Sequence, residues 1–142
     1  MILLDTNVLS EALKPAPEPR VVTWLDRRFP ECAISTVTIF ELRVGIELLD
    51  RGQRRDALER AVSRLVRRFG GRVYAFDIAS AESAATLPGK ARAWGLGLHQ
   101  IPAKLADLQI AGVAAAYGLE LATRNVGYFQ GIGLKVLDPW AA

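Results

Sequence analysis

Cysteine and histidine are nearly absent from this sequence, which has one of each among its 142 residues. A single cysteine, Cys32, cannot form an internal disulfide framework, and this scarcity fits a reducing compartment such as the cytoplasm. With His99 as the only histidine, the chain also lacks the side chains for a zinc site of the usual nitrogen and sulfur type. Any metal ion that it binds is therefore expected to have oxygen ligands.

Long apolar runs are missing as well. No segment reaches the roughly 18 apolar residues that identify a membrane-spanning helix. The apolar start of the chain meets Asp5 after four residues, which argues against a secretory signal peptide. Because 51% of the residues are nevertheless hydrophobic, residues 1–142 are expected to form a single compact domain, cytoplasmic and without a membrane partner.

The positive charge is unevenly distributed. Eight arginines and two acidic residues lie between positions 51 and 72, so this stretch carries +6 while the whole chain carries +3. A basic stripe on a mildly acidic body indicates a polyanionic partner such as RNA, and Arg60, Arg64 and Arg67 are its candidate phosphate contacts. The alternative is a solvated helix face stabilised by pairs such as Asp56–Arg60.

Short apolar runs alternate with helical patterns along the chain. Strands are predicted at 2–4, 32–35, 73–76, 119–122 and 134–137. Helices are predicted at 6–13, 21–29, 36–49, 53–69, 79–94 and 103–117, with a loop at 95–102 and a polar loop from Thr123. This alternation predicts a three-layer α/β/α fold with a mainly parallel sheet, in which functional residues gather at the carboxyl ends of the strands.

Two aspartates occupy positions where such an edge is expected. Asp5 follows the first strand directly, where an aspartate often caps a helix, although Thr6 and Asn7 can serve as caps equally well. Asp107 lies in the first turns of a helix rich in alanine and glycine, where negative charge is favourable in any case. The small side chains of that helix allow close approach to the sheet, which would bring Asp107 towards Asp5.

Glu41 is the most informative acidic residue. At 100° per residue it falls in line with Val37, Val44 and Leu48, opposite the polar face of its helix. A carboxylate within an apolar stripe requires a metal ion or an ion pair, and an arginine such as Arg124 is the alternative partner. On the same helix, Ile39 and Ile46 fall near the wet side, which predicts a patch covered by another subunit.

The segment after the fourth predicted strand is also polar. Thr123, Arg124 and Asn125 follow its carboxyl end. Asn125 is either an ordinary turn residue or a group that positions a metal-bound water, and Arg124 could bind a phosphate. Carboxylates that converge repel each other unless a cation intervenes, and Mg²⁺ or Mn²⁺ suits a few carboxylates, waters and phosphate oxygens. No Ser–His or Cys–His pair offers a covalent alternative.

Four segments, taken in order and at suitable spacing, resemble PIN-domain proteins, in particular VapC-type toxins of bacterial type II toxin–antitoxin pairs. They are 3–11 (LLDTNVLSE), 35–46 (STVTIFELRVGI), 107–114 (DLQIAGVA) and 118–126 (GLELATRNV), and the ending at 138–140 (DPW) is similar too. The resemblance implies a Mg²⁺-dependent endoribonuclease, with Mn²⁺ as a substitute, that is silenced by a cognate antitoxin and forms a homodimer or a higher assembly.

Carried over residue by residue, the resemblance makes Asp5, Glu41 and Asp107 the acidic triad that coordinates Mg²⁺. It places Thr6 and Thr123 beside the triad and puts Asn125 where the family often has a fourth acid. A second departure is Tyr128, which stands where relatives often have aspartate. These neutral residues predict one well-held metal ion with a weaker or absent second, and leave an inactive RNA-binding relative as the alternative.

A receiver-like signalling domain is a third hypothesis, because it also places acids at the strand ends of a parallel sheet. Asp77 could act as its phosphate acceptor, but Lys135 lies inside the last predicted strand rather than beyond it. A phosphatase of the haloacid dehalogenase type needs a second acid two residues after the first, and Asn7 occupies that place. Both patterns therefore fit the chain less well than the metal-dependent nuclease.

Overall fold

The computed structural model describes residues 1–93 and 105–142, and the side chains of residues 91–93 are not described. Five parallel strands form one sheet in the order β3-β2-β1-β4-β5. They are β1 (Ile2–Leu4), β2 (Cys32–Ser35), β3 (Val73–Tyr74), β4 (Glu120–Ala122) and β5 (Val136–Leu137). All five predicted strands are present, although the last three are shorter than predicted.

Seven α-helices connect or cover these strands within the described residues. They are α1 (Thr6–Ala12), α2 (Pro19–Arg28), α3 (Thr36–Glu47), α4 (Gln53–Phe69), α5 (Ile78–Ala93), α6 (Leu105–Tyr117) and α7 (Val126–Gln130). A 3₁₀ turn, η1 (Phe29–Glu31), precedes β2. None of the described helices is both long and apolar enough to cross a membrane. The predicted loop at 95–102, with His99, lies outside the described residues.

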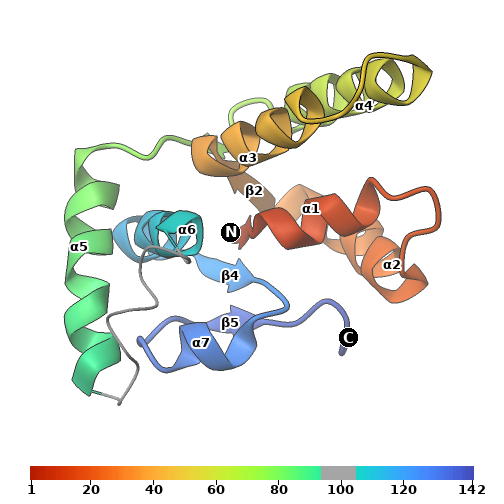
Figure 1. Ribbon diagram of the computed structural model, residues 1–142. Helices are drawn as coiled ribbons and strands as arrows, with labels where there is room; N and C mark the ends of the chain where they lie inside the picture. The colour runs from red at the N-terminus through yellow and green to blue at the C-terminus, as the bar shows by residue number, and fades with distance from the viewer. Residues whose placement is uncertain (94–104) are drawn as a thin grey trace.

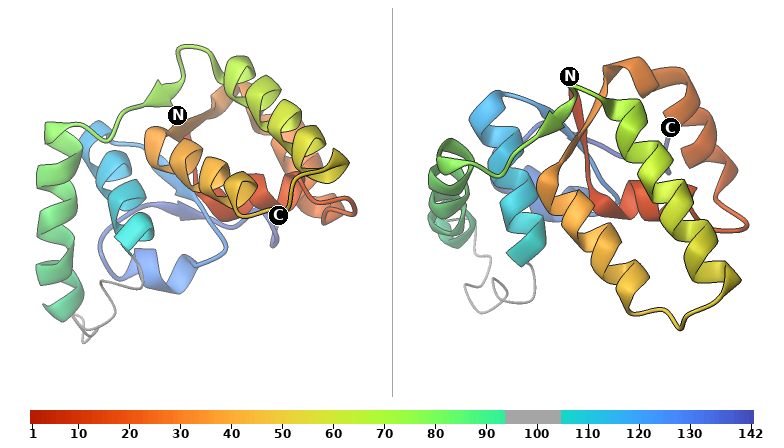
Figure 2. Two further views of the ribbon diagram at one scale, coloured as in Figure 1. Left: turned by 45° about the horizontal axis from the view of Figure 1, so that its top comes forward. Right: turned by 90° about the horizontal axis from the view of Figure 1, so that it is seen from above.

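The helices lie on both sides of the sheet, so the predicted three-layer architecture is confirmed (Figure 1). Alternate residues of each strand enter different cores, as the period of two of a strand requires. Ile2 and Leu4 of β1 pack with residues of α1 to α4, whereas Leu3 between them packs with residues of α5, α6 and α7. Figure 2 shows the paired helices α3 and α4 on one side and α5 with α6 on the other.

Helix α7 was not predicted, because its five residues, including Gly127, carry little helical signal of their own. Its existence depends on tertiary packing: the ring of Phe129 is completely buried in the core shared with α6. Tyr128 packs edge-on against that ring, with 5.0 Å between the ring centroids. The connection from Thr123 to β5 therefore contains a helix, where the sequence predicted only a polar loop.

Helix α3 is rotated relative to the sequence prediction. The predicted apolar stripe was wrong at two of its positions: Val37 is buried as predicted, but Val44 and Leu48 are 39% and 81% exposed. Leu42 and Ile46 lie on the core side instead. The patch predicted at Ile39 and Ile46 was wrong for the same reason, since Ile46 is 2% exposed and Ile39 is partly buried beside it. Apolar residues occur all round this helix, so periodicity could not identify its buried face.

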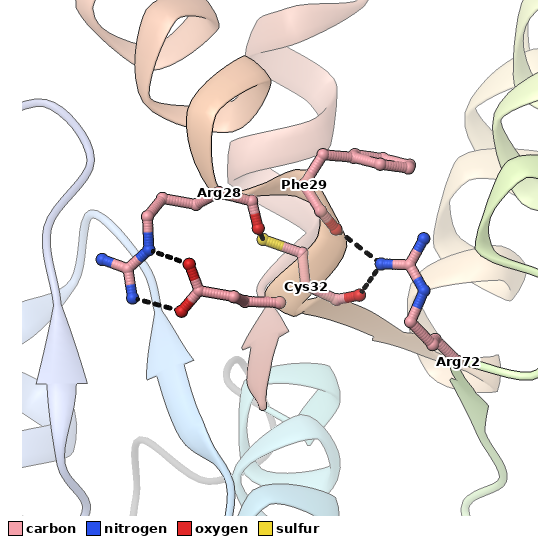
Figure 3. Close-up of polar contacts among 5 residues, drawn as sticks. Arg28, Phe29, Cys32 and Arg72 are labelled. Carbon is pink, nitrogen blue, oxygen red and sulfur yellow. Dashed lines mark hydrogen bonds and ion pairs between the residues drawn. The ribbon is translucent and has the colours of Figure 1, made fainter.

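Two arginines hold the start of β2 at the amino edge of the sheet (Figure 3). Arg72 donates from Nη1 to the backbone carbonyl groups of Phe29 and Cys32, and its guanidinium lies 4.9 Å from the Phe29 ring. Arg28 forms a bidentate ion pair with Glu31 at 2.8 and 2.9 Å. Burial raises the pKa of the Cys32 thiol to about 11, so this side chain stays protonated.

We expect Arg72→Ala to lower the free energy of unfolding by about 1–3 kcal/mol, because two carbonyl groups lose their donor. Arg68→Ala is the matched control, since the exposed Arg68 contacts the Phe29 ring at 4.3 Å and is expected to contribute about 0.5–1 kcal/mol. Urea unfolding of both variants measures the difference. Equal decreases in the free energy of unfolding would show that Arg72 stabilises the protein through its contact with the Phe29 ring and not through its hydrogen bonds to the two carbonyl groups.

Candidate metal centre

Asp5 stands where β1 passes into α1, at the carboxyl edge of the sheet. Its backbone N–H donates to the Ala122 carbonyl at 2.9 Å, which extends the pairing of β1 with β4 by one residue. Asp5 occupies the N-cap position of α1, but its side chain makes no capping hydrogen bond. Instead its Oδ2 atom accepts a 2.6 Å hydrogen bond from the hydroxyl of Thr123, the residue that follows β4.

Glu41 reaches the same place from the middle of α3. Its Oε1 atom accepts a 2.6 Å hydrogen bond from the hydroxyl of Thr6, the residue next to Asp5, and that hydroxyl also lies 3.0 Å from the Thr38 hydroxyl. Glu41 is half-buried and forms no salt bridge with any residue that the structure describes. The ion pair considered as an alternative for Glu41 is therefore not formed with an arginine in the described part of the chain.

The charge of Asp107 also acts on Asp5. Asp107 lies in the first turn of α6 and is half-buried. Burial raises the pKa of Asp5 to about 6, helped by repulsion from Asp107 and Glu41, while hydrogen bonds from Thr123 and the Thr6 backbone oppose the shift. The topology thus brings Glu41 of α3 and Asp107 of α6 close enough to Asp5, at the end of β1, to act on its charge, although the three residues are more than 30 positions apart in sequence.

These carboxylates do not form a ready-made metal cage. Among the described residues, no three histidine, cysteine, aspartate or glutamate side chains lie close enough together to hold a cation. The chemistry of the donors nevertheless fits Mg²⁺, since the pocket offers oxygen atoms and negative charge that repels itself. The neighbouring Asn7 Oδ1 atom is buried without a hydrogen-bond partner among the described residues. The role of the triad as metal ligands stays a prediction.

The residues after β4 have separate positions. Thr123 is fully buried and donates a hydrogen bond to Asp5. Asn125 is exposed at the N-cap position of α7, and its backbone N–H donates to the Thr123 hydroxyl at 3.1 Å. Arg124 lies over the Trp140 ring at 5.3 Å and stabilises the charge of Glu11. It is therefore not the partner of Glu41.

Tyr128 is a functional candidate that the sequence identified only as a departure from the family pattern. Burial and the charge of Asp107 raise the pKa of its hydroxyl, so the half-buried phenol lies within electrostatic reach of that carboxylate. Asn7 was considered as a possible helix cap and as the neutral residue two positions after Asp5, and the structure shows that its Nδ2 atom lies 3.3 Å from the Thr123 hydroxyl oxygen. Its position two residues after Asp5 was the available signal, because Asn7 lies in the first turn of α1 and its side chain meets Thr123, the residue that follows β4.

The predicted RNA contacts share one surface of α4. Arg60, Arg64 and Arg67 are exposed and line a shallow hollow of about 460 Å³ together with Asp56, Glu59 and Ser63. Other arginines of the basic stripe have structural partners: Arg72 bonds backbone carbonyls, and Arg55 pairs with Glu47 at 2.7 Å. Only part of the stripe is thus available to a polyanion.

Comparisons with known proteins agree with this geometry. The family model described as PIN domain matches residues 2–132. The chain belongs to the PIN-domain family. It is 40% identical to the toxin FitB of Neisseria gonorrhoeae over 142 residues, with 99% of each chain covered. It is also 35% identical to the VapC ribonuclease Y4jK of Sinorhizobium fredii over 142 residues, covering 99% of this chain and 98% of the relative.

The fold of this PIN domain is likewise similar to a solved one. The crystal structure of FitAcB from Neisseria gonorrhoeae matches with a TM-score of 0.89 and 36% identity, covering 100% of both chains. The five parallel strands flanked by helices are therefore those of the family, as the sequence predicted. Of the relatives above, one is named as a toxin and the other as a ribonuclease.

Proposed function

We propose that this PIN domain is a Mg²⁺-dependent endoribonuclease and the toxin of a toxin–antitoxin pair. The observation that carries the proposal is the buried Asp5 carboxylate, whose pKa is raised by burial and by the charges of Asp107 and Glu41. A buried carboxylate beside two others is unfavourable unless a cation compensates it. The names of the relatives, toxin FitB and VapC ribonuclease, support the same chemistry.

The chain's own residues would hold the cation and present the substrate to it. Asp5, Glu41 and Asp107 would provide its oxygen ligands, and Thr6 and Thr123 hold two of these carboxylates through 2.6 Å hydrogen bonds. Asn125, exposed at the start of α7, would hydrogen-bond the scissile phosphate or the attacking water. When bound, Mg²⁺ lowers the pKa of a coordinated water and offsets charge on the phosphate, so no covalent nucleophile is needed.

Metal dependence tests the proposal directly. Purified protein should cleave a mixed RNA pool with Mg²⁺ or Mn²⁺ and lose this activity in EDTA, with activity restored by excess metal. A single-stranded DNA of matched sequence establishes whether cleavage requires the ribose. Cleavage that continues in EDTA would contradict the metal-dependent mechanism.

An RNA-binding domain with weak or no catalysis is the second candidate. It is favoured by Asn125 and Tyr128, two uncharged residues near the acidic pocket. Binding of RNA without cleavage under any metal would support it. The receiver-like hypothesis is not retained, because the chain is a PIN domain and Asp77 has a structural role. Asp77 accepts hydrogen bonds from the Ser80 backbone at 2.9 Å and from the Tyr117 hydroxyl.

The basic surface of α4 is proposed to bind RNA phosphates. Replacing Arg60, Arg64 and Arg67 together by glutamine should reduce the slope of log K against log salt by about 2, since each phosphate contact on single strands contributes about 0.7. Fluorescence anisotropy with an RNA oligonucleotide at several salt concentrations measures the slope. Glutamine at the exposed Arg20, Arg27 and Lys90 is the control, because it removes the same charge elsewhere. Equal slopes for both triple variants would contradict the assignment.

A groove of about 500 Å³ between α1, α3 and α4 is the proposed binding site for a segment of the cognate antitoxin. Its walls are mainly apolar and include Leu13, Leu42, Leu49, Leu58 and Val62. Glu41 also lines this groove, so a basic side chain of the bound segment would meet the acidic pocket. Solved relatives include a toxin–antitoxin complex from Klebsiella pneumoniae, which supports a partner of this kind. An antitoxin that binds and leaves cleavage unaffected would contradict this location.

Self-association is proposed through α3. The exposed side chains of Phe40, Val44 and Leu48 form a stripe at helical spacing, with Phe40 and Leu48 exposed by 68% and 81%. This stripe replaces the Ile39 and Ile46 patch predicted from sequence. Light scattering should give a dimer at micromolar concentration for the wild type and a monomer for Leu48→Glu. A wild-type monomer would contradict the proposal.

A further inference from the structure

The hydroxyl of Thr123 is at the centre of a small buried network. It lies 2.6 Å from Asp5 Oδ2, 3.3 Å from Asn7 Nδ2 and 3.1 Å from the Asn125 backbone nitrogen. A threonine hydroxyl has one proton to donate and two lone pairs that accept. Two N–H groups donate to this oxygen, so both lone pairs are occupied. The single hydroxyl proton is therefore directed to the Asp5 carboxylate.

The same network determines the orientation of the Asn7 amide. With its oxygen turned towards Thr123, the amide would place two oxygens in contact with no proton between them, because the hydroxyl proton is already given to Asp5. Nδ2 must face the hydroxyl, and Oδ1 must point away. That Oδ1 atom is buried and has no hydrogen-bond partner within residues 1–93 and 105–142.

Asn7 is thus a poor choice for stability alone. A buried acceptor without a partner is unfavourable, and alanine has a higher helix propensity than asparagine at this second position of α1. Such a residue, unfavourable for the fold but in contact with the acidic pocket, is typical of a functional requirement. The contact through which it can act is the bond to Thr123.

We propose that Asn7 is a positioning residue of the acidic pocket: by fixing the direction of the Thr123 hydroxyl proton, it holds the Asp5 carboxylate in the orientation that a divalent cation requires. The inference deepens the proposed function and rests on it, because it assigns a role to Asn7 at the same metal centre. Asn7 itself is not a ligand in this arrangement. Partners that orient metal ligands in this way commonly affect metal affinity by 10-fold or more.

A double-mutant cycle tests the role of Asn7. The variants are Asn7→Leu, which keeps the number and branching of the side-chain heavy atoms, Thr123→Val, which replaces the hydroxyl by a methyl group, and the pair together. Asn7→Ala provides a second replacement that favours α1, should leucine disturb folding. The exposed Gln130→Leu is the control for an amide replaced by an apolar side chain. Isothermal titration with Mn²⁺ gives the dissociation constant, and urea unfolding of the metal-free proteins gives their stability.

We expect Asn7→Leu and Asn7→Ala to weaken Mn²⁺ binding about 10-fold, and Thr123→Val to weaken it by at least as much. The double variant should be no weaker than Thr123→Val, because Asn7 acts through that hydroxyl. Unchanged binding in both Asn7 variants, or independent effects that multiply, would overturn the role of Asn7. A wild type that binds no Mn²⁺ overturns the proposed function, and with it the positioning role. In that event the urea unfolding of the metal-free variants still tests the hydrogen-bond network. If the network exists, the effects of the Asn7 and Thr123 substitutions on the free energy of unfolding should not be additive.

Discussion

Asp5→Asn is expected to reduce the proposed Mg²⁺-dependent RNA cleavage by at least about 100-fold, since loss of Asp5 as the proposed direct ligand should exceed the 10–100-fold effect of an outer partner. The substitution is also expected to stabilise the metal-free protein at neutral pH. The asparagine side chain has the same shape and can accept the Thr123 hydrogen bond, but it carries no charge into the buried pocket. The same substitution should therefore lower the rate of RNA cleavage while it raises the free energy of unfolding of the metal-free protein.

The pH dependence follows from the raised pKa of Asp5. Its ordinary value of 3.8 becomes about 6 in the folded protein, so the folded state holds a proton more tightly than the unfolded state. Stability from this group is present below pH 4 and is lost as pH rises through about 6. At pH 8 the ionised Asp5 therefore lowers the free energy of unfolding by about 3 kcal/mol relative to its value at low pH. In EDTA at pH 8, Asp5→Asn should therefore have a free energy of unfolding about 3 kcal/mol higher than the wild type. At pH 4 the two proteins should be equally stable.

Urea unfolding at several pH values, with and without Mn²⁺, measures both effects. Mn²⁺ should raise the stability of the wild type in proportion to the logarithm of its concentration and should leave Asp5→Asn unchanged. Asp26→Asn is the matched control, because Asp26 is exposed on α2 and its replacement should alter neither property. Equal pH profiles for the wild type and Asp5→Asn would contradict the raised pKa, whereas retained cleavage would contradict the metal site.

The second large effect is expected at Gly112, where α6 packs against α5. A methyl group at this position would lie 2.4 Å from the Ala84 Cβ atom and 2.6 Å from the Ser80 carbonyl oxygen. Because one of these contacts is with backbone, the helices would have to separate. Gly112→Ala should lower the free energy of unfolding by about 1–3 kcal/mol, despite the better helix propensity of alanine, and Gly112→Leu by more.

Gly45→Ala is the control for Gly112→Ala. Gly45 lies inside α3, and a methyl group at this position would have nothing within 4 Å, so alanine there should stabilise by up to about 1 kcal/mol. Thermal and urea unfolding of the two variants should therefore shift in opposite directions. Destabilisation at both positions would contradict the explanation by close packing. Because α6 also carries Asp107, Gly112→Ala should in addition weaken Mn²⁺ binding.

The small residues of α6 predicted close packing of this helix but not its closest partner. Its run of alanine and glycine predicted a close approach to the sheet, and several of these residues are indeed buried in the core. The closest approach is to α5, however, through Gly112 and Ala84. A stripe of small side chains shows that something packs closely, but the partner depends on how the two helices cross.

Periodicity and the order of strands and helices were sufficient to predict the parallel sheet, the positions of most helices and the placement of Asp5 and Thr123 at strand ends. The three-dimensional structure was needed to establish which face of α3 is buried, how Glu41 meets Thr6, and where the protons of the Asn7, Thr123 and Asp5 network point. Such contacts join residues up to 118 positions apart. They depend on distances and angles between separate elements, which local patterns along one chain do not specify.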